Sequence, residues 1–153
     1  MTQEQKDLLL KDLCGRLPYG VKICDNKNSD IPYMNLCHVN GIVNEVFISS
    51  GKLCRVAPIE DIKPYLFPLS SMTEEQEKEL ITITDGKFRY MWGTITNAIP
   101  RKNISEWGTS ENAFINDMKV INSLYIWLLK NHFDIYGLIP KGLAEDATNL
   151  NVY

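Results

Sequence analysis

An Asn40-Gly41 dipeptide between two apolar runs is the feature that most constrains the fold of this chain. Both central residues of a type I′ turn have positive φ, which Asn and Gly tolerate best, so the pair predicts a two-residue hairpin. The register then places Val39 opposite Ile42. Both faces of the hairpin are largely apolar in this register, whereas a sheet with one solvated face alternates between apolar and polar residues. We therefore expect another element to pack on each face.

The neighbouring segments extend the hairpin into a β section over about residues 21–57. Apolar runs separated by clusters of Asn, Asp, Ser and Gly predict the individual strands. These strands are expected over residues 21–25, 32–39, 42–48 and 52–57. A short helical turn over residues 58–64 is expected to follow them.

Helix starts are marked on both sides of the β section. Thr2 and Thr73 are each followed three residues later by Gln, which is the spacing of a capping box. These signals predict one helix over residues 3–14 and another beginning at residue 74. Two interpretations remain for residues 81–92, which can form either the end of the second helix or a hairpin.

Apolar residues at helical spacing predict a long helix over about residues 113–131. Together the elements predict an α+β fold, in which a small antiparallel β-meander or SH3-like barrel packs with an N-terminal helix and a long C-terminal helix. A single domain over residues 1–153 is expected. A chain of this size buries about two-thirds of its surface on folding, so its core needs neither metal nor disulfide.

Composition excludes several classes of protein. The chain is 44% hydrophobic and 23% charged, which is ordinary for a globular domain, and its formal net charge of −3 argues against a general polyanion binder. No apolar run approaches the roughly 20 residues that cross a bilayer, and the first residues lack the pattern of a signal peptide. These features predict a cytoplasmic protein with no membrane partner.

Four cysteines, Cys14, Cys24, Cys37 and Cys54, contain no C-x-x-C pair. In a reducing compartment they are expected to remain free thiols packed among other residues, and no standard metal-ligand spacing is present. The sequence therefore predicts neither a disulfide framework nor a metal site.

Two histidines are the first candidates for chemistry. His38 lies on an apolar strand face without an acidic neighbour in sequence, which favours a structural role over catalysis. His132 follows the long helix, where a cation interacts favourably with the helix dipole, so we expect it to cap that helix.

Short enzyme signatures are absent from the sequence, among them G-x-x-x-x-G-K-[ST], G-x-G-x-x-G, G-x-S-x-G and H-E-x-x-H. We predict no catalytic residue and no cofactor. An enzyme of unrecognised type stays open, because sites assembled from scattered residues leave no linear motif.

Residues 87–110 form a segment in which cations and aromatic rings alternate. Its candidate ligand-binding residues are Arg89, Tyr90, Trp92, Arg101, Lys102 and Trp107. Such a mixture suits a ligand whose base stacks on a ring while its phosphate is neutralised. The alternation of Phe88, Tyr90 and Trp92 also matches the buried face of a strand, and this second interpretation is favoured.

Three stretches carry a resemblance to a known group of proteins. They are residues 1–14 running into 17–21, residues 62–66 with 68–73, and Trp127-Leu128 with residues 132–134 and 137–139. There the chain resembles uncharacterised proteins encoded by gut Bacteroidetes, their phages and mobile elements. The resemblance implies a small accessory protein of a phage or integrated element, and it implies no activity. Residues 87–110 depart from the pattern of the group, so binding specificity is expected there.

The function expected from these features is that of a non-enzymatic accessory binding protein. Such a protein could antagonise host defence by sequestering a nucleotide-like signal or by binding a host protein. The alternatives are a nucleic-acid-binding accessory protein, which the net charge disfavours, and the enzyme of unrecognised type. A homo-oligomer stays open.

Overall fold

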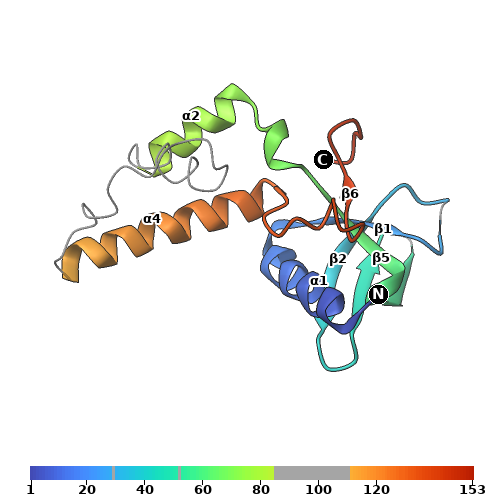
Figure 1. Ribbon diagram of the computed structural model, residues 1–153. Helices are drawn as coiled ribbons and strands as arrows, with labels where there is room; N and C mark the ends of the chain where they lie inside the picture. Colours follow the sequence, from blue (N-terminus) through green and yellow to red (C-terminus); the bar gives the residue numbers. More distant parts are fainter. Residues whose placement is uncertain (29, 52, 85–110) are drawn as a thin grey trace. The chain divides into compact units, whose positions relative to one another are not determined.

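The computed structural model describes residues 1–28, 30–51, 53–84 and 111–153 (Figure 1). The chain divides into two compact units, which are described separately: residues Met1–Ser71 with Leu128–Tyr153, and residues Met72–Trp127. The six predicted ligand-binding residues between Arg89 and Trp107 lie outside the described residues. The single domain stays a prediction.

The first unit is built on a six-stranded sheet with the strand order β4-β3-β2-β1-β5-β6. The strands are β1 (Lys22–Asp25), β2 (Met34–Asn40), β3 (Glu45–Ser49), β4 (Cys54–Pro58), β5 (Ile62–Leu66) and β6 (Glu145–Asp146). All neighbours are antiparallel except β5 and β6. A single 3₁₀ turn, η2 (Ile59–Asp61), connects β4 to β5. The predicted α+β class is confirmed.

The first five strands have the connectivity of an SH3-like barrel, and one ion pair shows how strongly the sheet curls. Arg55 on β4 lies 3.2 Å from the carboxylate of Asp25 on β1. In a flat sheet these strands, three positions apart, would be separated by about 14 Å. The curl therefore brings the edge strand β4 back towards the end of β1.

The hairpin between β2 and β3 differs from the sequence prediction. Val39 pairs with Val46 rather than Ile42, and a bulge lies between Leu36 and His38. The type I′ turn at Asn40-Gly41 is wrong, because Gly41 does not have positive φ. Instead the Asn40 side chain accepts a hydrogen bond from the Ile42 backbone at 3.2 Å, and Asn44, with φ 53°, closes a four-residue loop.

Helix α1 (Gln3–Arg16) begins at the predicted capping box. Thr2 accepts a hydrogen bond from the Gln5 backbone, and the Gln5 side chain accepts one from the Thr2 backbone. Figure 1 shows α1 lying beside the sheet. Its apolar side, with Leu9 and Leu13, is buried in the main core. The strands β1 to β5 contribute Ile23, Met34, Val46, Ile48, Ala57, Ile62 and Leu66 to the same core. After α1, a 3₁₀ turn, η1 (Leu17–Tyr19), ends at Gly20.

The inner side of α1 also carries a fully buried ion pair. Arg16 donates to both carboxylate oxygens of Asp12, at 2.7 and 2.8 Å. The same guanidinium donates to the backbone oxygen of Phe133 at 2.6 Å and, more weakly, to that of Leu129 at 3.4 Å. Burial raises the pKa of the Asp12 carboxyl, and Arg16 opposes this rise. The pair ties α1 to the segment that follows the long helix.

Helix α4 (Glu111–Lys130) is the predicted long helix, and its end is closed by backbone geometry. His132 has φ 60°, its N–H donates to Leu129, and the N–H of Phe133 donates to Leu128, which together form a Schellman motif. His132 was expected to cap the helix as a cation, and this is wrong: burial lowers the pKa of its ring to about 4. The cation near the last carbonyls is Arg16.

The second unit contains α2 (Glu74–Ile83) and most of α4. The capping box predicted at Thr73 is confirmed, since its side chain and that of Gln76 exchange hydrogen bonds with each other's backbone. Residues 81–83 belong to the helix, and Thr84 caps its end. The rest of the alternative hairpin lies outside the described residues.

Candidate functional site

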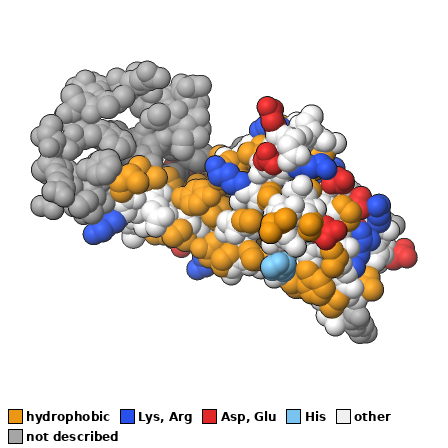
Figure 2. Space-filling view, turned by 90° about the horizontal axis from the view of Figure 1, so that it is seen from below, with side chains coloured by type: hydrophobic (Ala, Val, Ile, Leu, Met, Phe, Trp, Pro, Cys, Tyr) orange, Lys and Arg blue, Asp and Glu red, His pale blue; other side chains and the backbone are white. Residues whose placement is uncertain are grey.

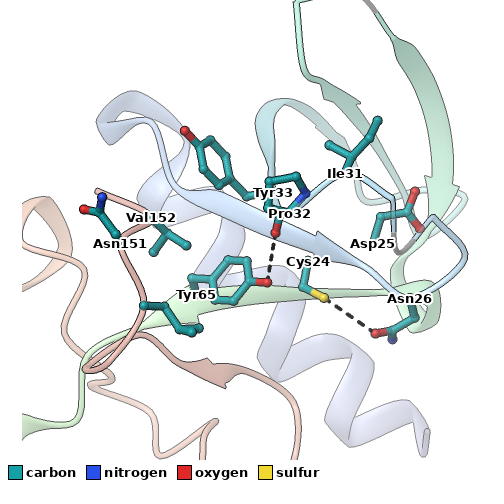
Figure 3. A pocket seen from close by; sticks show the side chains of 10 residues that line it. Cys24, Asp25, Asn26, Ile31, Pro32, Tyr33, Tyr65, Asn151 and Val152 are labelled. Carbon is teal, nitrogen blue, oxygen red and sulfur yellow. Dashed lines mark hydrogen bonds between the residues drawn. The ribbon is translucent and has the colours of Figure 1, made fainter.

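A pocket of about 570 Å³ opens on the face of the sheet opposite to α1 (Figure 3). Three segments far apart in sequence form it: the end of β1 with the loop that follows, the middle of β5, and the C-terminal segment. Its lining residues are Cys24, Asp25, Asn26, Ile31, Pro32, Tyr33, Tyr65, Leu150, Asn151 and Val152. Because side chains alternate along a strand, Cys24 and Tyr65 face this side while Ile23 and Leu66 enter the main core.

Two tyrosines shape the pocket. The hydroxyl of Tyr65 donates to the backbone oxygen of Pro32 at 3.1 Å, and burial raises the pKa of Tyr65 to about 12, so this donor keeps its proton at neutral pH. The ring of Tyr33 is held from one side by the ammonium of Lys22, 4.9 Å from the ring centroid. Lys22 is itself fixed by a 2.6 Å hydrogen bond to Asn35. Both rings are thereby set in place before any ligand arrives.

The polar groups of the pocket are few. Cys24 Sγ lies 3.9 Å from the amide oxygen of Asn26, and Asn151 adds a second side-chain amide. Asp25 points to the other side of β1 from Cys24, as Figure 3 shows, and its carboxylate is paired with Arg55. Among the described lining residues there is no lysine, arginine or histidine. The pocket can enclose an apolar or aromatic group and offer it hydrogen bonds from amides.

The C-terminal segment closes one side of the pocket and is attached by its last residue. The hydroxyl of Tyr153 accepts a hydrogen bond from the Lys22 backbone at 3.1 Å and donates one to the backbone oxygen of Tyr65 at 2.8 Å. Its ring stacks on His132, with centroids 4.0 Å apart and an interplanar angle of 14°. His132, one of the two candidates for chemistry, therefore packs against this anchor.

The other histidine, His38, is exposed and pairs with Phe47 on the same side of the sheet as the pocket. It borders a hollow of only about 110 Å³ together with Val56. Hydrophobic side chains are exposed elsewhere on the surface as well (Figure 2). Ile42, at the tip of the hairpin, is 94% exposed, and Val56 is 57% exposed. These residues belong to no enclosed site.

The described part of the chain contains neither a cluster of metal ligands nor a helix that could span a membrane. Over residues 1–28, 30–51, 53–84 and 111–153, no three His, Cys, Asp or Glu side chains gather as metal ligands. All four cysteines lie within these ranges and are free thiols, but the expectation that they pack in the core is wrong, because Cys14, Cys37 and Cys54 are exposed. None of the described helices has the length and apolar character needed to cross a bilayer.

Comparison with known proteins gives a plain result. No family model, no curated protein and no solved structure matches the chain. The resemblance to proteins of gut Bacteroidetes, their phages and mobile elements therefore stays a prediction.

The residues that line the pocket were not singled out by sequence reasoning. Tyr33, Tyr65 and Val152 are separated by tens of residues and share no linear motif. The apolar character of both hairpin faces predicted a cover on each side of β2 and β3, and this is wrong for the outer face, where His38, Phe47 and Val56 are exposed. Over β1 and β5 a cover is present, a small second core of Tyr65, Ala147 and Val152.

Proposed function

We propose that this protein is a non-enzymatic binding protein whose pocket receives an apolar side chain from an extended segment of a partner protein. The observation that carries the proposal is the pocket wall, in which the rings of Tyr33, Tyr65 and Pro32 stand beside aliphatic side chains. Aromatic depressions on small β domains suit extended segments, because such segments lose little conformational entropy on binding and present side chains at regular intervals.

The charge of the pocket favours a protein partner over a nucleotide. A phosphate group is bound by cations or by a helix N-terminus, and the described lining has neither. Its one charged residue, Asp25, is an anion and is already paired with Arg55. Binding of a nucleotide-like signal or of a nucleic acid would depend on the basic residues Arg89, Arg101 and Lys102. These lie outside the described residues, so both ligands stay predictions.

The setting of the proposal comes from the resemblance to phage and mobile-element proteins. In that setting the partner is a host protein, and occupying it would antagonise host defence. The fold adds support of a general kind, since the pocket is built from rigid strands and a loop, as binding sites on small scaffolds commonly are.

Peptide selection on the whole protein tests the proposal. Short random peptides are displayed and selected, and calorimetry then measures their affinity for wild-type protein, Tyr33→Ala and Val56→Ser. We expect selected peptides to be apolar and to lose about tenfold or more in affinity for Tyr33→Ala, because a buried aromatic anchor is removed.

Val56→Ser is the matched control, because Val56 is 57% exposed on the same sheet and does not line the pocket. Its affinity should equal that of wild-type protein. Melting curves establish that Tyr33→Ala remains folded. Selected peptides that bind Tyr33→Ala as tightly as wild-type protein would contradict the proposal, and so would a nucleotide that binds in competition with them.

A further inference from the structure

The segment after β6 borders one side of the pocket as a strap that is held mainly at its two ends. At its start, Ala147 is fully buried and donates to the backbone oxygen of Leu66 at 2.8 Å. Residues 148–151 are exposed and have no regular secondary structure, and burial resumes at Val152. We call residues 148–153 the C-terminal strap.

Tyr153 fastens the strap at a defined position in the sheet. The register between β1 and β5 pairs Ile23 with Pro64, so the next pair along is Lys22 with Tyr65. The hydroxyl of Tyr153 lies between these two residues, accepting from the N–H of Lys22 and donating to the oxygen of Tyr65. The phenol thus bridges the backbones of β1 and β5 at the point where their ladder of paired residues ends.

The two residues that hold the strap also contact the loop before β2, which forms another wall of the pocket. Lys22 places its ammonium over the ring of Tyr33, and Tyr65 donates its hydroxyl to Pro32. The strap itself contributes Leu150, Asn151 and Val152 to the lining. The fastening point is therefore connected by direct contacts to Tyr33 and Pro32 as well as to the strap.

We infer that the C-terminal strap is the movable wall of this pocket and that the hydroxyl of Tyr153 is its latch, so that release of the latch opens the pocket to its ligand. The inference rests on the proposed function, because it describes the regulation of the same site. The strap is held by the hydroxyl and ring of Tyr153 and by the side chain of Val152. Between these anchors and β6 its hydrogen bonds are local ones, from Leu150 to Ala147 and from Thr148 to Asp146. A local opening of this kind needs far less free energy than unfolding of the sheet.

Cys24 reports on the opening without any ligand, because it lies in the pocket and packs in the small core that contains Val152. Replacing the three other cysteines by serine leaves Cys24 as the one thiol. Its reaction rate with the aromatic disulfide 5,5′-dithiobis(2-nitrobenzoic acid) is then measured. Tyr153→Phe keeps the ring and removes the hydroxyl, so we expect the rate to rise by roughly threefold to tenfold, the range that follows from one lost hydrogen-bonding group.

Two controls separate opening of the strap from general loosening. Tyr19→Phe removes a phenol hydroxyl from a residue that does not line the pocket, and the rate at Cys24 should not change. A second protein keeps only Cys14, which is exposed on α1, and its rate should be insensitive to Tyr153→Phe. Val152→Ala, which weakens the strap through packing, should raise the rate at Cys24 as Tyr153→Phe does.

The inference is overturned if Tyr153→Phe and Val152→Ala leave the rate at Cys24 unchanged, or if they raise the rate at Cys14 equally. Its failure is distinguishable from failure of the proposed function. Peptide binding that depends on Tyr33, with a rate at Cys24 that does not depend on Tyr153, contradicts the strap alone. A latch-dependent rate without any peptide ligand contradicts the proposed function alone.

Discussion

Replacement of Arg16 by methionine tests the most demanding electrostatic feature of the fold. Arg16 and Asp12 are both fully buried, and the guanidinium also satisfies the backbone oxygen of Phe133. Methionine has a similar length and fills the space with apolar atoms. The substitution therefore leaves Asp12 without its cation and leaves the oxygen of Phe133 without its donor.

The expected loss of stability follows from what Asp12 can do next. An unpaired buried carboxylate avoids its charge by taking up a proton, which at pH 7 costs about 4 kcal/mol, at about 1.4 kcal/mol for each pH unit above an unfolded pKa near 3.9. The lost hydrogen bond to Phe133 adds about 1 kcal/mol. We therefore expect Arg16→Met to lose roughly 3 to 5 kcal/mol, as removal of one partner of a buried ion pair typically does.

Urea denaturation followed by circular dichroism measures this loss and its pH dependence. In Arg16→Met the folded state holds a proton on Asp12 that the unfolded state has released, so stability should rise as the pH falls from 7 towards 4. The slope should exceed that of wild-type protein by up to about 1.4 kcal/mol per pH unit. The double variant Asp12→Leu/Arg16→Met should recover much of the stability and lose the extra slope. A loss below about 1 kcal/mol for Arg16→Met, or equal slopes in the single and double variants, would refute the reasoning.

Three further outcomes are expected. Burial lowers the pKa of His132 to about 4, so the unfolded state takes up a proton first and stability should fall as the pH drops from about 6.5 towards 4. In urea titrations His132→Asn should lose this part of the pH dependence, and a pH profile equal to that of wild-type protein would contradict the prediction. Asn44→Gly should keep wild-type stability, whereas Asn44→Val should lose about 1 to 3 kcal/mol at φ 53°, and equal melting temperatures would show that the loop is not strained. Alkylation under denaturing, non-reducing conditions should modify all four cysteines in the mass spectrum, and a smaller number would reveal a disulfide.

Local chemistry accounts for the elements that the sequence predicted well. The capping boxes at Thr2 and Thr73 involve residues three positions apart, so neighbouring residues alone carry the signal. The long helix was likewise visible as a repeat of apolar residues, and its observed bounds, Glu111–Lys130, differ from the predicted ones by two residues at most. The α+β class followed from the order of these elements.

Prediction failed where several local solutions compete. Asn40-Gly41 is compatible with a two-residue turn, yet the loop has four residues, because the Asx turn at Asn40 and the left-handed Asn44 place Val46 in the main core. At His132 the position was predicted correctly and the reason was wrong. A helix C-terminus attracts any cation, and only the fold decides that Arg16, more than a hundred residues away, supplies it.

By itself the sequence determined where α1, α4, the start of α2 and the strands β1 to β4 form, because capping, periodicity and turn chemistry act over a few residues. It did not predict β5 or β6, since residues 62–64 were expected to continue a helical turn. Only the tertiary structure decided the register of the β2–β3 hairpin, the partner of Arg16 and the existence of the pocket. The pocket brings Cys24, Tyr33, Tyr65 and Val152 together through the curl of the sheet and the return of the C-terminal strap. Contacts of this kind depend on how distant segments pack against one another, and no pattern within a single segment encodes them.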